Sequence, residues 1–101
     1  MSDEKFEGVS ITLGGRKLIV PALTIKQVRV TLADDLKALD DKDANVSMMA
    51  GQRVILAAIR RNYPEMSEEF IEDSLDLNNY KAVLSAIMGA SGLVQQAGAG
   101  E

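Results

Sequence analysis

The sequence predicts a mainly α protein in which an N-terminal β-hairpin is followed by a bundle of three to four helices. Two short runs of alternating apolar and polar residues flank Gly14-Gly15, a dipeptide typical of tight hairpin turns. From Thr24 onward, apolar residues recur at the three- and four-residue spacing of helices. The length of 101 residues suits one domain, which we expect over residues 1–94, with a flexible Gly/Ala-rich tail over 95–101.

The hairpin is expected to consist of residues 9–13 and 16–20, and Pro21 should end its second strand. Pairing across a two-residue turn places Ile11 opposite Leu18 and Val9 opposite Val20. The alternation then puts all the large apolar side chains on one face, so that the pattern and the turn predict the same register. The residues on this apolar face are Val9, Ile11, Leu13, Leu18 and Val20.

The first helix should begin with a capping box, in which Thr24 is the N-cap and Gln27 bonds back to it. A continuous helix from here has one apolar stripe, which predicts a buried face. Val30 lies roughly opposite that stripe. The residues of the stripe are Ile25, Val28, Leu32, Leu36 and Leu39. A polar connector over residues 40–45 follows.

The second helix is expected from Val46 or Ser47 to Asn62, with Asn45 or Ser47 as its cap, and must end before Pro64. It is apolar almost all round, which is typical of a central helix. A short third helix should start at Ser67 as N-cap, with acidic residues next to its positive end. A fourth should start near Asn78 and end around Gly89.

No pattern in the sequence indicates catalysis or a cofactor. The chain contains no His and no Cys, which removes the commonest general base and the commonest zinc ligands. Residues 41–45 match the first ligand spacings of a calcium loop, but Val46 replaces the required Gly and Gln52 the required Glu. We therefore expect an acidic connector there, no metal site and no enzymatic activity.

Net charge and hydropathy disfavour nucleic acid and membranes as partners. The net charge of −4 disfavours binding to nucleic acid, because the phosphate backbone is repelled. The cluster Arg53, Arg60 and Arg61 is expected to be a solvated or paired helix face. The longest apolar run, residues 54–59, is far too short to cross a bilayer, so no membrane association is expected. A charged N-terminus without an apolar segment favours the cytoplasm.

Apolar residues remain that a domain of this size is not expected to bury. We predict that they form a protein-contact face, and that the chain forms homo-oligomers through it. The alternative is that other helices of the same domain cover them. The predicted contact residues are Val30, Met48, Met49, Leu93 and Val94.

In residues 11–24 (ITLGGR to PALT) and 59–70 (IRRNYP to SEEF), the sequence resembles phage tail assembly chaperones of long-tailed phages and prophages. Residues 11–16 (ITLGGR), followed by Pro21-Ala22-Leu23-Thr24, are similar to that family's hairpin and its "P-L-T" entry to the first helix. Residues 59–64 (IRRNYP) and 67–70 (SEEF) resemble the family's "R-x-x-P … T-x-E-x-F" passage, and the last helix is similar too. The resemblance spans about residues 9–96.

The resemblance implies a chaperone in the cytoplasm of the bacterial host. Its partner would be the phage tape measure protein, which it keeps soluble until tail-tube subunits assemble around it. An extended form of such chaperones recruits the tube subunits. The family has no catalytic residues to transfer to this chain. The alternative from the sequence is a small structural virion protein, such as a tail or head–tail completion component.

Overall fold

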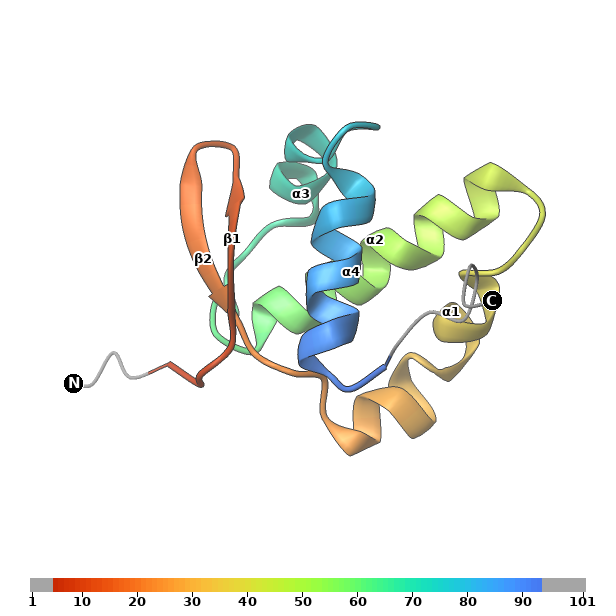
Figure 1. The fold of residues 1–101 in the computed structure, drawn as a ribbon, viewed down its shortest axis with the longest axis horizontal. Helices are drawn as coiled ribbons and strands as arrows, with labels where there is room; N and C mark the ends of the chain where they lie inside the picture. Colours follow the sequence, from red (N-terminus) through yellow and green to blue (C-terminus); the bar gives the residue numbers. More distant parts are fainter. Residues whose placement is uncertain (1–4, 94–101) are drawn as a thin grey trace.

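The fold is an N-terminal β-hairpin packed against a set of helices, as predicted. The computed structural model describes residues 5–93, so the expected boundary between domain and tail at residues 94 and 95 lies outside the described residues. Figure 1 shows the order of the elements. They are β1 (Val9–Leu13), β2 (Arg16–Val20), the π-helix η1 (Gln27–Thr31), α1 (Ala33–Ala38), α2 (Ala44–Arg60), α3 (Glu68–Ser74) and α4 (Tyr80–Ala90).

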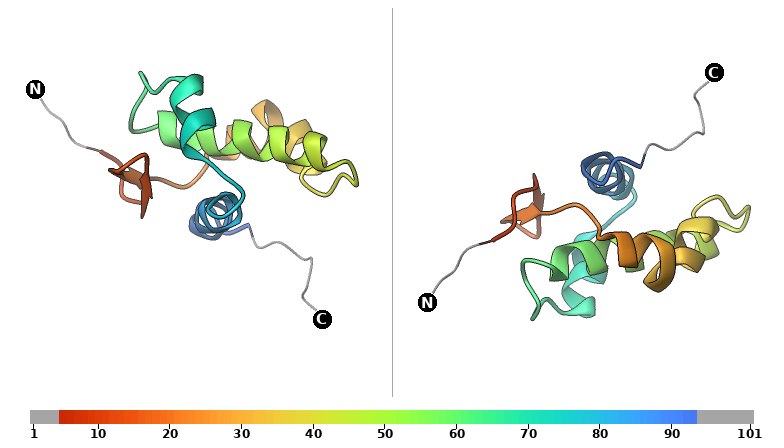
Figure 2. Two further views of the ribbon diagram at one scale, coloured as in Figure 1. Left: turned by 90° about the horizontal axis from the view of Figure 1, so that it is seen from above. Right: turned by 90° about the horizontal axis from the view of Figure 1, so that it is seen from below.

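The hairpin has the predicted register, with Ile11 paired to Leu18 and Val9 to Val20. Both turn glycines have positive φ, +55° at Gly14 and +78° at Gly15, a conformation that side chains disfavour. The predicted apolar face is turned toward the helices, which all lie on one side of the hairpin (Figure 2). The hairpin therefore forms one wall of the core.

The end of α2 holds the hairpin in place through side-chain hydrogen bonds. The Tyr63 hydroxyl accepts a bond from the Ile19 N–H at 2.9 Å, and Asn62 Nδ2 donates to the Ile19 carbonyl at 2.8 Å. Asn62 also bonds both backbone groups of Phe6. Asn62 is the buried polar side chain within residues 5–93, and all its polar atoms have partners. These bonds occupy the outer edge of β2 at Ile19, which an isolated hairpin would leave open.

The first helix differs from the prediction. Its capping box is confirmed, since the Gln27 N–H donates to Thr24 Oγ1 and the Thr24 N–H to Gln27 Oε1. The continuous helix is wrong, however, because a π-helical segment precedes a break at Leu32, and α1 starts only at Ala33. A wheel of 3.6 residues per turn does not apply through a π-helix. Ile25, predicted to be buried, is consequently 76% exposed.

Helix α2 is the central helix, as predicted, but it starts and ends two residues or so earlier. Its N-cap is Asp43, whose carboxylate accepts bonds from the N–H groups of Asn45 and Val46. The predicted caps Asn45 and Ser47 are therefore wrong. Ser47 instead donates its hydroxyl to the Leu39 carbonyl, which ties α2 to the end of α1. Asp43 is the N-cap because its backbone is extended and it lies directly before the first helical residue.

The last two helices close the core. Ser67 is the N-cap of α3, as predicted, and accepts a bond from the Phe70 N–H. Helix α4 starts at Tyr80 and packs its buried face, Val83, Leu84, Ile87 and Met88, over α2 and β1. The largest fully buried side chains come from both strands, from the residue that follows β2, and from α2, α3 and α4. They are Leu13, Leu18, Val20, Pro21, Val54, Ile55, Ile59, Ile71 and Ile87.

Candidate protein-contact surfaces

Large apolar side chains remain exposed at several places on the described surface. They are Phe6 (56%), Ile25 (76%), Val30 (67%), Val46 (41%), Met49 (57%) and Leu77 (83%). Scattered exposed apolar residues are normal, so their neighbours decide whether they matter. Two of them, Leu77 and Ile25, line hollows.

Leu77 lines a groove between the first half of α2 and the segment that joins α3 to α4. We name it the Met48–Leu77 groove; it has a volume of about 320 Å³. Its apolar residues are Met48, Leu75, Leu77 and Tyr80, and its polar ones are Gln52, Glu72 and Asp76. A mixed lining of this kind, apolar with a few polar groups, is typical of binding sites.

The segment that bears Leu77 is held by a set of short hydrogen bonds. Asp76 Oδ1 accepts from the N–H groups of Asn78 and Asn79, and Asn79 Oδ1 accepts from the Asp76 N–H, all at 2.8–2.9 Å. Asn79 Nδ2 also donates to the Ser74 carbonyl. The backbone on both sides of Leu77 is therefore fixed, and its side chain is presented to solvent by an ordered turn.

Tyr80 forms the inner wall of the groove and lies against α2. Its hydroxyl donates to the Ser47 carbonyl at 3.4 Å, and burial raises the pKa of its phenol above the ordinary value. The ring can approach α2 because Gly51 has no side chain in the way. Desolvation of the phenol indicates that this end of the groove is partly closed to water.

Ile25 lines a second hollow, of about 220 Å³, between η1 and the end of α4. Its other residues are Leu23, Thr24, Val28, Arg29, Ser91 and Leu93. The Ser91 hydroxyl accepts a bond from the Leu23 N–H, so that the two segments stay together. Val30 is exposed on the same π-helix.

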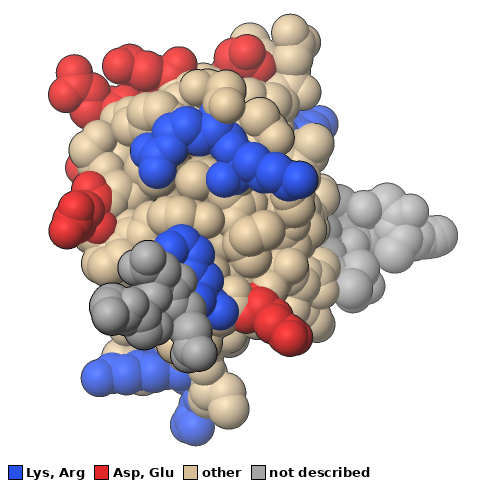
Figure 3. Space-filling model, turned by 90° about the vertical axis from the view of Figure 1, so that its left-hand side faces the viewer, with Lys and Arg blue, Asp and Glu red and all other residues tan. Residues whose placement is uncertain are grey.

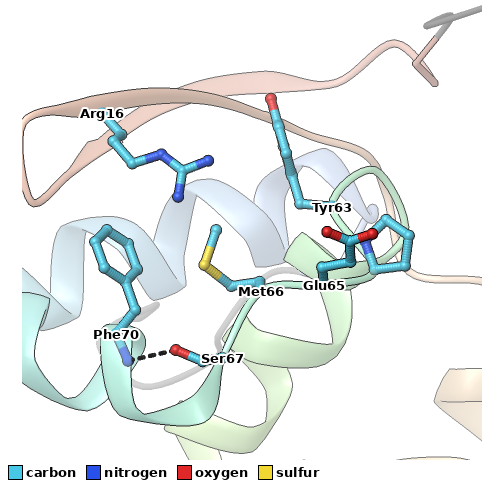
Figure 4. A pocket seen from close by; sticks show the side chains of 7 residues that line it. Arg16, Tyr63, Glu65, Met66, Ser67 and Phe70 are labelled. Carbon is cyan, nitrogen blue, oxygen red and sulfur yellow. Dashed lines mark hydrogen bonds between the residues drawn. The ribbon is translucent and has the colours of Figure 1, made fainter.

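A third hollow, of about 460 Å³, lies under the hairpin (Figure 4). The Arg16 side chain extends from β2 into the hollow, and its guanidinium lies 5.4 Å from the centroid of the Phe70 ring. Ser67 has its hydroxyl directed at the Phe70 N–H, where it caps α3. Tyr63, Pro64, Glu65 and Met66 complete the lining.

Two stretches that are distant in the sequence, residues 11–16 and 59–70, meet at this hollow. Arg16 belongs to residues 11–16, whereas Tyr63, Pro64, Ser67 and Phe70 come from residues 59–70. Gly14 contributes to the same junction, since a Cβ there would lie 2.9 Å from the Phe70 ring. The two stretches therefore specify how the hairpin docks on α3, which is a structural role.

Lys and Arg side chains gather on the hairpin side of the molecule, with acidic side chains around the margin (Figure 3).

The side chains of the predicted arginine cluster all make contacts within the fold. Arg53 forms an ion pair with Asp35 at 2.8 Å, and Arg60 donates to the Met66 carbonyl. Arg61 donates to the Ala22 carbonyl and stacks 4.3 Å from the Phe6 ring. Arg53 confirms the expected pairing with a carboxylate, whereas Arg60 and Arg61 bind backbone carbonyls instead.

In the acidic connector over residues 40–45, two carboxylates accept backbone hydrogen bonds at the start of α2. Asp41 Oδ1 accepts from the Asp43 N–H, and Asp43 caps the helix. Within residues 5–93, no group of three His, Cys, Asp or Glu side chains is arranged to hold a metal ion.

The structure places the predicted contact residues differently from one another. Val30 and Met49 are well exposed, whereas Met48 is half-buried in its groove. Leu93 is also half-buried and packs against the core, so the expectation that nothing covers it is wrong. Val94 lies outside the described residues. Sequence reasoning missed Leu77, although a single Leu within the polar run Asp76–Asn79 was a usable signal.

No helix among residues 5–93 is both long enough and apolar enough to span a membrane. The sequence matches no protein-family model, no characterised protein and no solved structure.

Proposed function

We propose that this chain is a phage tail assembly chaperone that binds the tape measure protein, keeps it soluble and promotes assembly of the tail tube. The proposal is supported by the resemblance of residues 9–96 to that family. The observation that supports it most directly is the exposure of Val30, Met49 and Leu77 on a fold that is otherwise well packed. Exposed apolar groups with hollows beside them are what a binder of apolar chain segments needs.

The task is physical and requires no catalysis. A tape measure protein is a very long helical chain with apolar stretches, which aggregate unless they are covered. A chaperone covers them reversibly, and each contact must be weak enough to be released when tube subunits arrive. Met side chains suit this role because they are flexible and polarisable, and Met48 and Met49 lie at the surface of α2.

The proposal places the chain in the cytoplasm of the bacterial host, where tails are assembled. Its partners are the tape measure protein and, through an extended form, tail-tube subunits. Self-association into homo-oligomers belongs to the same proposal, because exposed apolar side chains of two copies can cover one another.

Co-expression with the long tape-measure-like reading frame from the same genome tests the proposal. We expect the tape measure protein to move from the insoluble to the soluble fraction and to co-purify with this chain. An insoluble tape measure protein at equal expression would contradict the proposal. Stoichiometric presence of this chain in purified phage particles would instead support a structural virion protein.

A further inference from the structure

We infer that the Met48–Leu77 groove binds an amphipathic helix whose apolar side chains are flanked by Lys or Arg. This inference rests on the proposed function and names the chemistry of the tape-measure segment that the chain would take. It follows from three features of the groove: an apolar floor, an exposed leucine on a fixed turn, and acidic groups that have no cationic partner among residues 5–93.

The apolar contact would be made by Leu77 together with the floor of the groove. Leu77 is 83% exposed, yet the turn around it is fixed by the bonds between Asp76 and Asn79. Because the backbone is already ordered, a partner that covers Leu77 loses little conformational freedom of this loop on binding. Met48 and Leu75 then provide a pliable apolar surface beside it.

The polar groups of the groove select a cationic partner. Glu72 uses Oε2 to accept a bond from Gln52, and Asp76 uses Oδ1 for the turn. Their other oxygens, Glu72 Oε1 and Asp76 Oδ2, have no hydrogen bond or ion pair to any residue within 5–93. Neither Lys nor Arg lines this groove, whereas Arg16 lines the hairpin hollow and Arg29 the hollow at η1.

Charge complementarity therefore favours a basic partner. Two carboxylates at an apolar groove attract Lys or Arg side chains and repel acidic ones, and the net charge of −4 acts in the same direction. The bound segment should be a helix because the groove lies between helical elements and none of its lining residues belongs to a strand. Apolar side chains at helical spacing can fill such a groove, and the flanking positions of the helix meet its rim.

A pair of synthetic peptides of ~18 residues, about five helical turns, tests the inference on the full chain. Both carry Leu at three- and four-residue spacing, one with flanking Lys and one with flanking Glu. Two variants probe the groove. Leu77→Asp removes the apolar contact, and the double variant Glu72→Gln/Asp76→Asn removes the charges while keeping the acceptor oxygens for Gln52 and for the turn. Val46→Asp is the control, since it introduces the same charge at an exposed apolar residue of α2 that lines none of the three hollows described above.

We expect wild type and Val46→Asp to bind the Lys peptide and not the Glu peptide in fluorescence anisotropy. Leu77→Asp should weaken binding by about tenfold or more, as for a central contact residue. The charge variant should weaken it about three- to tenfold at low salt and less at high salt, because exposed charges are screened. Equal binding of both peptides by wild type, or unchanged binding by either groove variant, would overturn the inference.

The co-expression experiment separates this inference from the proposed function. If wild type and Leu77→Asp both keep the tape measure protein soluble, the function stands and the groove is not the site. If wild type does not keep it soluble but the peptides behave as expected, the groove binds basic amphipathic helices and the proposed function is wrong.

Discussion

Gly51, on the buried face of α2, lies against the phenol ring of Tyr80, the first residue of α4, with no room for a side chain between them. Glycine is an unfavourable residue inside a helix, by about 1 kcal/mol relative to alanine. Here it lets the Tyr80 hydroxyl and ring approach α2 closely, so that Tyr80 forms the inner wall of the Met48–Leu77 groove. The groove therefore depends on a residue that weakens its own helix.

Gly51→Ala should destabilise the protein by about 1–3 kcal/mol, because the new Cβ would overlap the Tyr80 ring and force it to move. Urea unfolding followed by circular dichroism measures the change. Gly89→Ala is the control: it is also a helical glycine, but no atom of residues 5–93 outside its own helix would lie within 4 Å of the new Cβ, so it should stabilise by about 0.5–1 kcal/mol. Equal effects of the two substitutions would contradict the packing argument.

We expect alanine at the two turn glycines to reduce the stability of the protein by unequal amounts. Both have positive φ, so alanine at either position is strained, by about 1–2 kcal/mol. Gly14→Ala should cost more than Gly15→Ala, because only at Gly14 would the Cβ also meet the Phe70 ring, whereas nothing lies within 4 Å at Gly15. Thermal unfolding of both variants tests the order. A loss for Gly15→Ala as large as that for Gly14→Ala would contradict the predicted contact with Phe70.

Asn62→Ala should reduce stability by about 1–3 kcal/mol. The substitution leaves the Ile19 carbonyl and the Phe6 backbone groups without their side-chain partner. Asn45→Ala, at an exposed position of α2 whose side chain makes no such bonds among residues 5–93, should change stability by less than about 0.5 kcal/mol. Denaturant titration of the two variants compares them, and similar values would refute the bridging role of Asn62.

Tyr80 predicts a loss of stability in alkaline solution. Burial raises the pKa of its phenol in the folded chain above the ordinary value of 10.0 that it regains on unfolding. Between these two values the folded state binds more protons than the unfolded state, so the free energy of unfolding falls as the pH rises above 10.0. Tyr80→Phe should make this fall shallower in denaturant titrations across that range. An identical slope in wild type and variant would argue against a desolvated phenol.

Self-association should depend on the exposed apolar residues. At tens of micromolar, an ordinary range for weak interfaces, we expect dimers or larger species by multi-angle light scattering. The double variant Val30→Asp/Met49→Asp should shift the protein toward monomer, since both side chains are exposed and add no buried charge when replaced. A strict monomer in the wild type would contradict the prediction. So would an unchanged distribution in the variant.

The hairpin and most helix starts were predictable because their determinants are local. The Gly-Gly turn and the alternation specify the register of β1 and β2, and the Thr24–Gln27 and Ser67 caps use bonds over three residues. The N-cap of α2 was assigned to the wrong residue, although Asp43 was as close in sequence. Several capping residues lie in that connector, and only the backbone conformation distinguishes them.

The candidate site was predictable only in part. Val30 and Met49 were predicted to be available for contact, and both are exposed. Leu77 was missed, although the polar residues Asp76 and Asn79 beside it are the ones that build the turn that exposes it. Ile25 was predicted to be buried, and the π-helix that exposes it has no simple sequence signature.

The sequence alone determined the hairpin and the central apolar helix of this protein. It also showed that the chain has no His and no Cys, and that it has more apolar side chains than a domain of this size is expected to bury. Capping bonds, turns and apolar periodicity depend only on residues that are close in the sequence, so they can be predicted without the three-dimensional structure. Only the tertiary structure decided which apolar side chains stay exposed and which of them share a groove with acidic groups. That outcome depends on contacts between distant segments, such as Gly51 with Tyr80, and on hydrogen bonds that hold a turn in place.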